Sequence, residues 1–209
     1  MKYYKLTNET TVNFQGKTLF KIELTIDCKW GSAGDRGGWI ESEDNLSDNA
    51  WVYGNAQVYG NAQVYGDAQV YGNAQVYGNA WVYGNAQVYG DAQVYGNAQV
   101  YGNAQVYGDA QVYGNALVYG DAQVYGNAQV YGDAQVYGDA WEKSPLQIQG
   151  SKHFFSVSSR TQISIGCHSK TFETWAEEFK EIGEKENYSI EEIEEYRLYI
   201  ELAFKLYKK

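Results

Sequence analysis

The sequence predicts an all-β solenoid: a three-sided, single-stranded β-helix of about six coils with a small cap at each end. One six-residue phrase, Asn/Asp-Ala-Gln-Val-Tyr-Gly, repeats from Asn49 to Asp139. Within it Ala, Val and Gly alternate with Asn/Asp, Gln and Tyr, which is typical of a strand because successive side chains point to opposite faces. A helix is excluded, since each recurring glycine would cost it about 1 kcal/mol.

The Gly-Asn or Gly-Asp step that ends each phrase predicts a corner. Glycine adopts a positive φ cheaply, and Asn and Asp tolerate it better than most residues. Three corners close a coil of about 18 residues, and successive coils then stack about 4.8 Å apart. The valine phase extends back to Ile40 and Leu46 and forward to Ile148, within Leu146–Ser151. We therefore expect a rod about 30 Å long.

The repeats resemble the hexapeptide-repeat family, in which an aliphatic residue is followed four positions later by a small one. Val52 with Ala56 and Val58 with Ala62 match that pattern. The resemblance implies a left-handed triangular β-helix, an exception to the usual right-handed crossover. A right-handed three-sided solenoid, as in bactofilins, stays open as the alternative.

The tyrosines are predicted to form three columns along the outside of the rod. One column holds Tyr53, Tyr71, Tyr89, Tyr107 and Tyr125. The inward Val and Ala side chains make a thin core, and stacked aromatic pairs would add roughly 0.5–1.5 kcal/mol each. We interpret the columns as a structural ladder rather than as a ligand site.

Three parts are expected along the chain: an N-terminal β-hairpin cap with a glycine-rich loop at 1–38, the solenoid at 39–151, and a C-terminal ββαα cap at 152–209. The first part has two apolar runs around a turn at Asn13–Lys17. A hairpin there would cover the open strand edge of the first coil. In the last part, two strands precede a helix that starts at Thr171 and stops at Gly183, and a Ser189–Glu192 capping box starts a second helix.

The segments flanking the repeats resemble those of hexapeptide-repeat proteins common in bacteriophages and prophages. The leading segment, Gly34–Ser47, reads Gly-Asp-Arg-Gly-Gly-Trp-Ile-Glu-Ser-Glu-Asp-Asn-Leu-Ser. In the closing module, Gly166-Cys167 precedes a helix that begins at a threonine. The resemblance implies a phage or prophage origin and covers nearly the whole chain.

The rod is expected to hold the whole charge excess of a chain with net charge −10. Between Gly37 and Glu142 there are eleven acidic residues and no Lys or Arg. Direct nucleic-acid binding is therefore excluded for the rod, because phosphates need basic partners. No apolar run is long enough for a membrane span. Cys28 and Cys167 lie in opposite caps, too far apart for a disulfide, which favours a cytoplasmic location in a bacterial host.

Four positions break the outward glutamine pattern: Trp51, Trp81, Leu117 and Trp141. Trp51 and Trp141 end one column, where we expect them to pack on the caps. Trp81 and Leu117 share a different column, and an apolar pair on a polar face needs a cover. We expect this face to meet a protein partner, a second copy or the chain's own tail. The candidate partner-binding residues are Trp81, Gln99, Leu117, Asp109 and Asp121.

Catalysis is not expected, although many hexapeptide-repeat proteins are acyltransferases. Those enzymes use a histidine carried by a coil, whereas His153 and His168 both lie beyond the repeats. Cys167 and His168 are adjacent and would point to opposite faces of a strand, so they do not form a nucleophile–base pair. No cofactor and no metal site are predicted, and a small ligand held between cap and rod has no supporting motif.

The sequence thus favours a non-enzymatic binding or structural protein that acts through protein–protein contact, with inhibition of a host defence system as one hypothesis. The alternatives are an acidic DNA mimic and an acyltransferase-like enzyme. The rod has a low charge density for a DNA mimic: it has eleven acidic residues, whereas duplex DNA of the same length would hold roughly eighteen negative charges.

Overall fold

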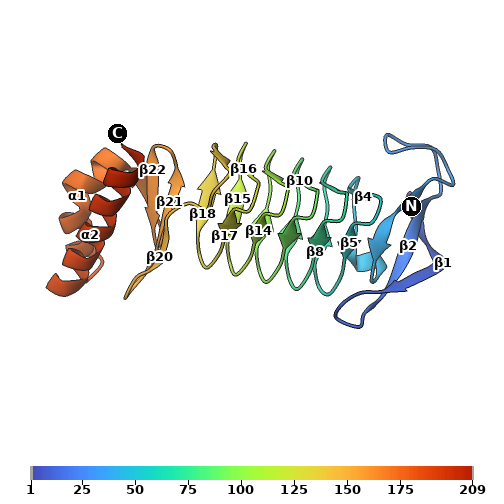
Figure 1. The fold of residues 1–209 in the computed structure, drawn as a ribbon, viewed down its shortest axis with the longest axis horizontal. Coiled ribbons are helices and arrows are strands. Elements are labelled where there is room, and N and C mark those ends of the chain that lie inside the picture. The colour runs from blue at the N-terminus through green and yellow to red at the C-terminus, as the bar shows by residue number, and fades with distance from the viewer. Residues whose placement is uncertain (1, 209) are drawn as a thin grey trace.

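The computed structural model describes residues 2–208 and shows a straight rod of stacked coils with a cap at each end (Figure 1). Antiparallel strands form the N-terminal cap, and two helices lie at the far end of the rod beyond a small sheet (Figure 1). The predicted β-solenoid of about six coils, with β structure at one end and α+β structure at the other, is confirmed.

Three parallel sheets form the sides of the rod, and each is named here after its first repeat strand. The β4 face contains β4 (Trp51–Val52), β7 (Gln69–Val70), β10 (Gln87–Val88), β13 (Gln105–Val106), β16 (Gln123–Val124) and β19 (Ala140–Trp141). The β5 face contains β3 (Arg36–Ile40), β5 (Gln57–Val58), β8 (Gln75–Val76), β11 (Gln93–Val94), β14 (Gln111–Val112) and β17 (Gln129–Val130). The β6 face contains β6 (Gln63–Val64), β9 (Trp81–Val82), β12 (Gln99–Val100), β15 (Leu117–Tyr119) and β18 (Gln135–Tyr137).

The coils are joined by a regular ladder of backbone hydrogen bonds. Gln87 pairs with Gln105 and Val88 with Val106, so each phrase lies over the phrase 18 residues later. The amide of Tyr89 donates to the carbonyl of Val106 at 2.9 Å, and equivalent bonds repeat along the rod. The predicted coil length is confirmed, and the ladder supplies the stabilisation that the small core side chains cannot.

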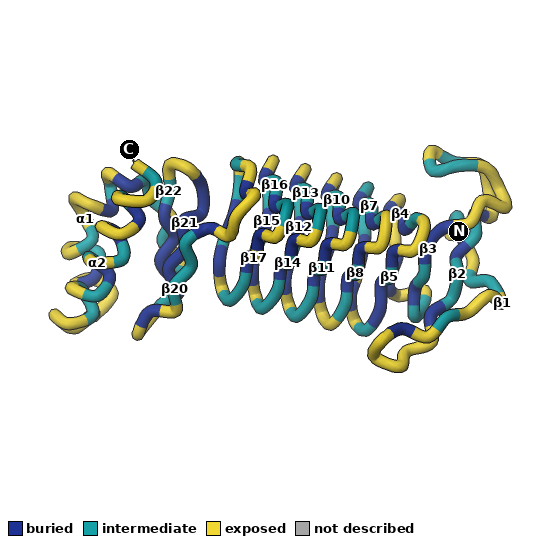
Figure 2. The backbone as a smooth tube through the Cα atoms, viewed as in Figure 1, coloured by how far each residue is buried: buried dark blue, intermediate teal, exposed yellow. Residues whose placement is uncertain are grey.

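Every repeat valine is buried, and the alanines from Ala50 to Ala134 are buried with them. Figure 2 shows the result as coils in which buried stretches alternate with exposed corners. The corner glycines from Gly54 to Gly138 all have φ between +60° and +74°. Side chains therefore alternate inward and outward as the phrase predicts, with methyl groups inside and phenol rings outside.

The N-terminal cap is a hairpin that runs directly into the first coil. Its strands are β1 (Tyr4–Val12) and β2 (Thr18–Leu24), and β2 pairs antiparallel with β3 (Arg36–Ile40). The Asn13 side chain closes the predicted turn by accepting from the amides of Gln15 and Lys17. Ile40 pairs with Val58, so it holds the valine register that the sequence assigns to it.

Leu46 also takes its predicted register, through an isolated bridge to Val64. It follows a short 3₁₀ helix, η1 (Glu43–Asn45), rather than a strand. The side chain of Asn45 donates to the carbonyls of Gly60 and Ala62 at 3.0 and 2.9 Å. That amide satisfies carbonyls of the second coil that an irregular first coil would leave open.

The register slips by one residue in the last coil, which corrects the predicted outward position of Trp141. Val124 pairs with Trp141, only 17 positions later, and Gln123 pairs with Ala140. Trp141 therefore takes an inward valine position, not the outward glutamine position of the repeat, and is 3% exposed. The last coil has no further coil beneath it, so a large apolar side chain closes the end of the core.

The segment Leu146–Ser151 does not form a coil, although it keeps the repeat phase. Its strand β20 (Gln147–Gln149) pairs antiparallel with β21 (Phe154–Ser159), so it belongs to the C-terminal cap. The solenoid thus ends nearer to Trp141 than to the predicted residue 151. The Gln147 side chain instead bonds the last coil edge, accepting from the Tyr131 amide at 2.8 Å.

The C-terminal cap is a four-stranded antiparallel sheet with two helices rather than the predicted ββαα unit. The sheet order is β20-β21-β22-β23, with β22 at Gln162–Ile165 and β23 at His168–Thr171. Helix α1 (Phe172–Lys185) begins at its predicted cap, Thr171, and α2 (Ile190–Tyr207) begins at the predicted Ser189–Glu192 capping box. Gly183 does not end α1, which continues to Lys185. The glycine instead allows close packing of α2, since a Cβ at this position would lie 2.8 Å from Cγ1 of Ile193.

Candidate functional site

The β6 face carries the one outward column that changes chemistry in the middle of the rod. Its strands pair in order as Gln63, Trp81, Gln99, Leu117 and Gln135. Trp81 and Leu117 lie two strands apart, about 10 Å, with Gln99 between them. On the β5 face every outward repeat position is a glutamine. The structure therefore confirms that Trp81, Gln99 and Leu117 share one face.

Trp81 is 42% exposed, which is high for an indole, and Leu117 is partly exposed. The chain's own tail does not cover this face, because both C-terminal helices lie beyond the end of the rod (Figure 1). That part of the expectation is wrong. The end tryptophans behave differently: Trp51 is 1% exposed under the N-terminal cap, and Trp141 contacts the ring of Tyr207 on α2.

A second network links seven of the repeat tyrosines to a glutamine of the next coil. The hydroxyl of Tyr83 donates to Oε1 of Gln99 at 3.2 Å, and six other tyrosines make the same bond at 3.2–3.3 Å. At position 81 the amide acceptor is replaced by an indole, which meets the ring of Tyr65 edge-on at 6.4 Å. Trp81 therefore gives up a regular contact of the repeat, which indicates that its role is not to hold the coil.

The predicted tyrosine ladder is present. Tyr71, Tyr89, Tyr107 and Tyr125 stack with ring centroids 4.7–5.1 Å apart, and the other two columns stack in the same way. Tyr53 is the exception: it meets Tyr71 edge-on because Trp51 and Trp30 pack against it. Since the ring faces are occupied by one another, the columns offer no free face on which a base or sugar could stack.

Burial raises the pKa of most of these phenols above its usual value, and a neighbouring tyrosine of the same column adds to the shift in several. The phenols therefore stay protonated and neutral at physiological pH. They keep donating to the glutamines, as a structural ladder requires.

The corners carry a third ladder, made by asparagine side chains. Nδ2 of Asn79 donates to Oδ1 of Asn97, Asn97 donates to Asn115, and Asn115 donates to Asp133, at 2.8–3.0 Å. Asp91 and Asp121 likewise accept from the asparagine one coil before them. An aspartate accepts but cannot donate, so each of these acids ends a run of asparagines.

The two candidate acids lie at different corners. Asp121 follows β15 and precedes β16, so it borders the β6 face beside Leu117. Asp109 follows β13 and precedes β14, so it lies at the corner between the β4 and β5 faces. The structure therefore groups Asp121 with Trp81, Gln99 and Leu117, and separates Asp109 from them.

Lysines of the N-terminal cap neutralise part of the acidic rod. Lys17 pairs with Glu41 at 2.9 Å, Lys2 pairs with Glu43 at 2.8 Å, and Lys29 pairs with Asp67. Glu41 also accepts from the Gly60 amide at 2.7 Å, and this bond together with Lys17 holds its pKa below the usual value. Most of the remaining acidic residues lie towards the C-terminal half of the rod and are divided among its three corners.

A depression of about 540 Å³ adjoins the N-terminal end of the β6 face, where η1 replaces a strand. Its lining includes Glu43, Asp44, Asn61 and Gln63. Lys2 pairs with Glu43 there, which leaves the carboxylate of Asp44 without an ion-pair partner among residues 2–208. Gln63 belongs both to this lining and to the column of Trp81, so the depression adjoins the N-terminal end of that column.

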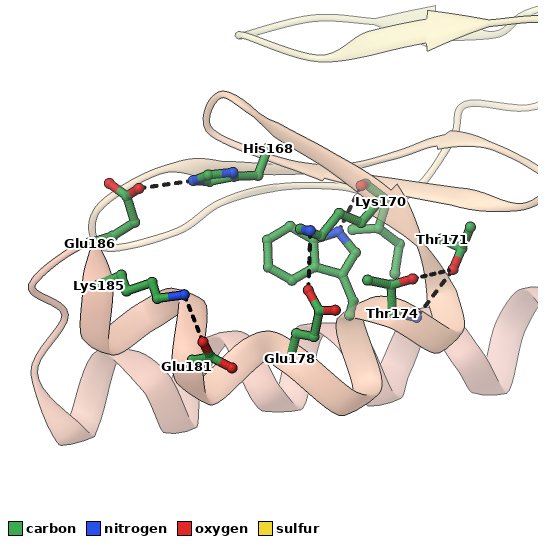
Figure 3. Close-up of polar contacts among 10 residues, drawn as sticks. His168, Lys170, Thr171, Thr174, Glu178, Glu181, Lys185 and Glu186 are labelled. Carbon is green, nitrogen blue, oxygen red and sulfur yellow. Dashed lines mark hydrogen bonds and ion pairs between the residues drawn. The ribbon is translucent and has the colours of Figure 1, made fainter.

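The two histidines belong to the C-terminal cap and are held by structural contacts. Figure 3 shows His168 on β23, where Nε2 lies 2.9 Å from Oε1 of Glu186. Beside it along α1, Lys170 pairs with Glu178 at 3.1 Å and Lys185 with Glu181 at 2.6 Å. These pairs line a groove of about 370 Å³. Every charged side chain of the groove has a partner within it, so nothing there is poised for a ligand.

Cys167 is exposed and Cys28 is partly buried, and neither forms a disulfide. Residues 2–208 contain no group of three or more His, Cys, Asp or Glu side chains suited to a metal ion. Within the same residues, no helix is long and apolar enough to cross a membrane.

Stacked triangular coils, three outward ladders and a cap at each end define a β-solenoid repeat protein. Its repeats are similar to those of the family described as YdcK Beta solenoid repeat, which matches residues 56–72, 68–84, 74–90, 86–102, 92–108, 98–111, 110–126, 122–138 and 128–143. The matched segments lie within the rod and leave both caps outside. A comparison with curated proteins gives no match.

Proposed function

We propose that this solenoid is a non-enzymatic binding protein whose β6 face docks another protein. The observation that carries the proposal is the exposed Trp81, which shares a column with Leu117 in the middle of the rod, where all other positions of the glutamine register hold glutamine. A tryptophan at the centre of a flat face is the kind of anchor that dominates binding energy in protein interfaces. Strand β9, which carries Trp81, is hydrogen-bonded to β6 and β12, so binding requires little loss of backbone conformational entropy.

The charges around this face favour a partner with basic groups beside an apolar patch. Asp121 borders the face at one end and Asp44 lies in the depression at the other. No lysine or arginine lies between Gly37 and Glu142, so the rod itself offers no competing cation. Complementary charge of this kind speeds encounter and sets orientation more than it adds affinity.

The biological setting follows from the resemblance of Gly34–Ser47 and of the Gly166-Cys167 module to phage and prophage proteins. On that basis we place the chain in the bacterial cytoplasm as a phage-encoded protein. Inhibition of a host defence protein by occlusion is the role that suits a rigid binding surface without catalytic groups. The two unpaired cysteines are compatible with a reducing compartment.

The two alternatives have less support. A DNA mimic needs a dense row of acids, but Glu41, Glu43 and Asp67 are paired with lysines and the other acids are divided among three corners. An acyltransferase needs a histidine on a coil, but His168 pairs with Glu186 in the cap.

The test replaces Trp81 and Leu117 by glutamine, the residue of the repeat consensus, so the fold is kept while the candidate surface is lost. Tagged wild-type and Trp81→Gln/Leu117→Gln proteins are used to capture partners from bacterial lysate. A Gln93→Ala variant on the β5 face is the matched control. We expect a protein that the wild type and the control retain and the double variant loses. Equal retention by all three would remove the β6 face from the proposal.

The host-defence role has its own assay. Expression of the chain in a strain that carries a defence system should restore plaque formation by a sensitive phage, and the double variant should not. If the double variant restores plaque formation as well as the wild type does, the anti-defence activity does not depend on the β6 face.

A further inference from the structure

Helix α2 has an apolar row on its outer side that no described residue covers. Leu198, Leu202 and Leu206 are 51%, 40% and 55% exposed. On the other side of the helix Tyr196, Ile200 and Ala203 are buried against α1 and the sheet. We call the three exposed leucines the leucine ridge. An unpaired apolar ridge on a surface helix indicates an interaction site.

We propose that the leucine ridge pairs with the same ridge of a second copy of this chain, with the two α2 helices antiparallel. Leucines at i, i+4 and i+8 form one of the rows whose interdigitation gives the commonest helix crossing, at about −50°. A row that packs into its own copy is self-complementary, as a two-fold interface requires. The middle residue, Leu202, then lies at the two-fold axis.

The charges along α2 select the antiparallel orientation and the identity of the partner. The first half of the helix carries four glutamates against one arginine, namely Glu191, Glu192, Glu194, Glu195 and Arg197, and Arg197 pairs with Glu194 and with Glu201 of the second half. Lys205 lies in the last turn, and Lys208, the C-cap, pairs with Glu173 of α1. The first half is therefore acidic and the C-terminal end is basic. Antiparallel helices place the acidic half of each copy towards the basic end of the other, whereas parallel helices would superpose like charges. The same glutamates would be repelled by an anionic membrane surface.

The interface is small, since three leucines and their neighbours cover less than the roughly 800 Å² per partner of a standard interface. The dimer therefore forms and dissociates with concentration. Its consequence for the proposed function is bivalency: two rods joined at their C-terminal caps present two β6 faces, and binding of one face raises the effective concentration of the other. The pairing itself does not depend on the β6 face.

Sedimentation velocity over two orders of magnitude in concentration tests the proposal. We expect a monomer–dimer equilibrium whose dissociation constant rises at least roughly tenfold in Leu202→Glu, since the substitution buries a charge at the axis. Ile190→Glu, at an exposed position outside the ridge, is the matched control and should leave the dissociation constant unchanged. Trp81→Gln should also leave it unchanged, which separates this interface from the β6 face.

Cross-linking locates the axis. At an interaxial distance of about 8–10 Å and a Cα radius of about 2.3 Å, the two Leu202 positions come within disulfide reach. In a Cys28→Ser/Cys167→Ser background, Leu202→Cys should form an intermolecular disulfide and Ile190→Cys should not. A monomer at all concentrations, or a dimer that Leu202→Glu leaves intact, would overturn the proposal. So would a monomer whose ridge instead retains a different protein, because the ridge would then belong to that partner.

Discussion

Two corner glycines with the same backbone conformation can be replaced by alanine to test how closely successive coils pack at their corners. Gly114 and Gly138 both have φ of +73°. A Cβ on Gly114 would lie 2.9 Å from the amide nitrogen and 3.0 Å from the carbonyl oxygen of Gly132 in the next coil. A Cβ on Gly138 would have nothing within 4 Å. Gly138→Ala thus carries the cost of the positive φ alone, and Gly114→Ala adds the clash.

The positive φ costs an alanine about 1–2 kcal/mol, and the stiffer unfolded chain returns about 0.4–1 kcal/mol. We therefore expect Gly138→Ala to lose about 1 kcal/mol. In Gly114→Ala the clash is with backbone, which cannot rotate away, and overpacking adds about 1–3 kcal/mol. The expected total for Gly114→Ala is then about 2–4 kcal/mol.

The measurement is the free energy of unfolding in urea, followed by far-UV circular dichroism. Hydrogen exchange at the corner amides shows whether the loss is local, because a repeat protein can open coil by coil. Gly16→Ala, with φ of +76° and open space at the hairpin tip, is a second control for the φ cost. Equal losses in Gly114→Ala and Gly138→Ala would show that contact between coils at the corners does not limit the side chain there, and the reasoning would be refuted.

Three further predictions concern the outward ladders and the end of the core. Trp81→Gln should change the free energy of unfolding by less than about 0.5 kcal/mol, whereas Trp141→Gln, the same change at a buried position, should cost about 3–5 kcal/mol. The urea midpoints of the two variants measure this difference, and similar midpoints would contradict the register slip. Asn97→Asp should cost about 1 kcal/mol because it removes the hydrogen-bond donor to the next coil, while Asp133→Asn, which keeps its acceptor oxygen, should be neutral. A thermal melt in which Asp133→Asn is the less stable variant would contradict the donor-to-acceptor direction of the asparagine ladder. Burial raises the pKa of phenols such as Tyr59, so the contribution of these phenols to the free energy of unfolding should be constant below about pH 10 and fall as pH rises further. The fall should be up to about 1.4 kcal/mol per pH unit for each tyrosine that is protonated only in the folded state, and less for exposed rings. Urea midpoints that do not fall in this alkaline range would contradict the prediction.

The ladders show how far a periodic sequence determines its own surface. Once three phrases make a coil, the Tyr, Gln and Asn positions of one coil lie over the same positions of the next coil at a fixed spacing. The stacking of Tyr71 on Tyr89 can therefore be predicted from the repeat period alone. The sharing of one column by Trp81 and Leu117 follows in the same way. What the period cannot show is which neighbouring atoms a side chain reaches, and the bond from Tyr83 to Gln99 depends on the rotamers of both residues.

The ends of the rod were predicted least well, because the repeat no longer decides there. Leu146–Ser151 keeps the phase of the phrase, but it pairs with β21, since an antiparallel neighbour was available and a further coil was not. The leucine ridge of α2 was missed for a related reason. In the sequence an 18-residue helix with apolar residues on several sides does not reveal which of them face the protein.

From its sequence alone, this protein determines a triangular β-solenoid with small aliphatic side chains inside and phenol rings outside, because a six-residue period with a glycine corner admits few other windings. Its left-handedness stays a prediction of the resemblance. Tertiary structure alone decided the one-residue slip that buries Trp141 and the exposure of the leucines on α2. Those features depend on contacts between segments that share no period, and only the folded chain brings such segments together.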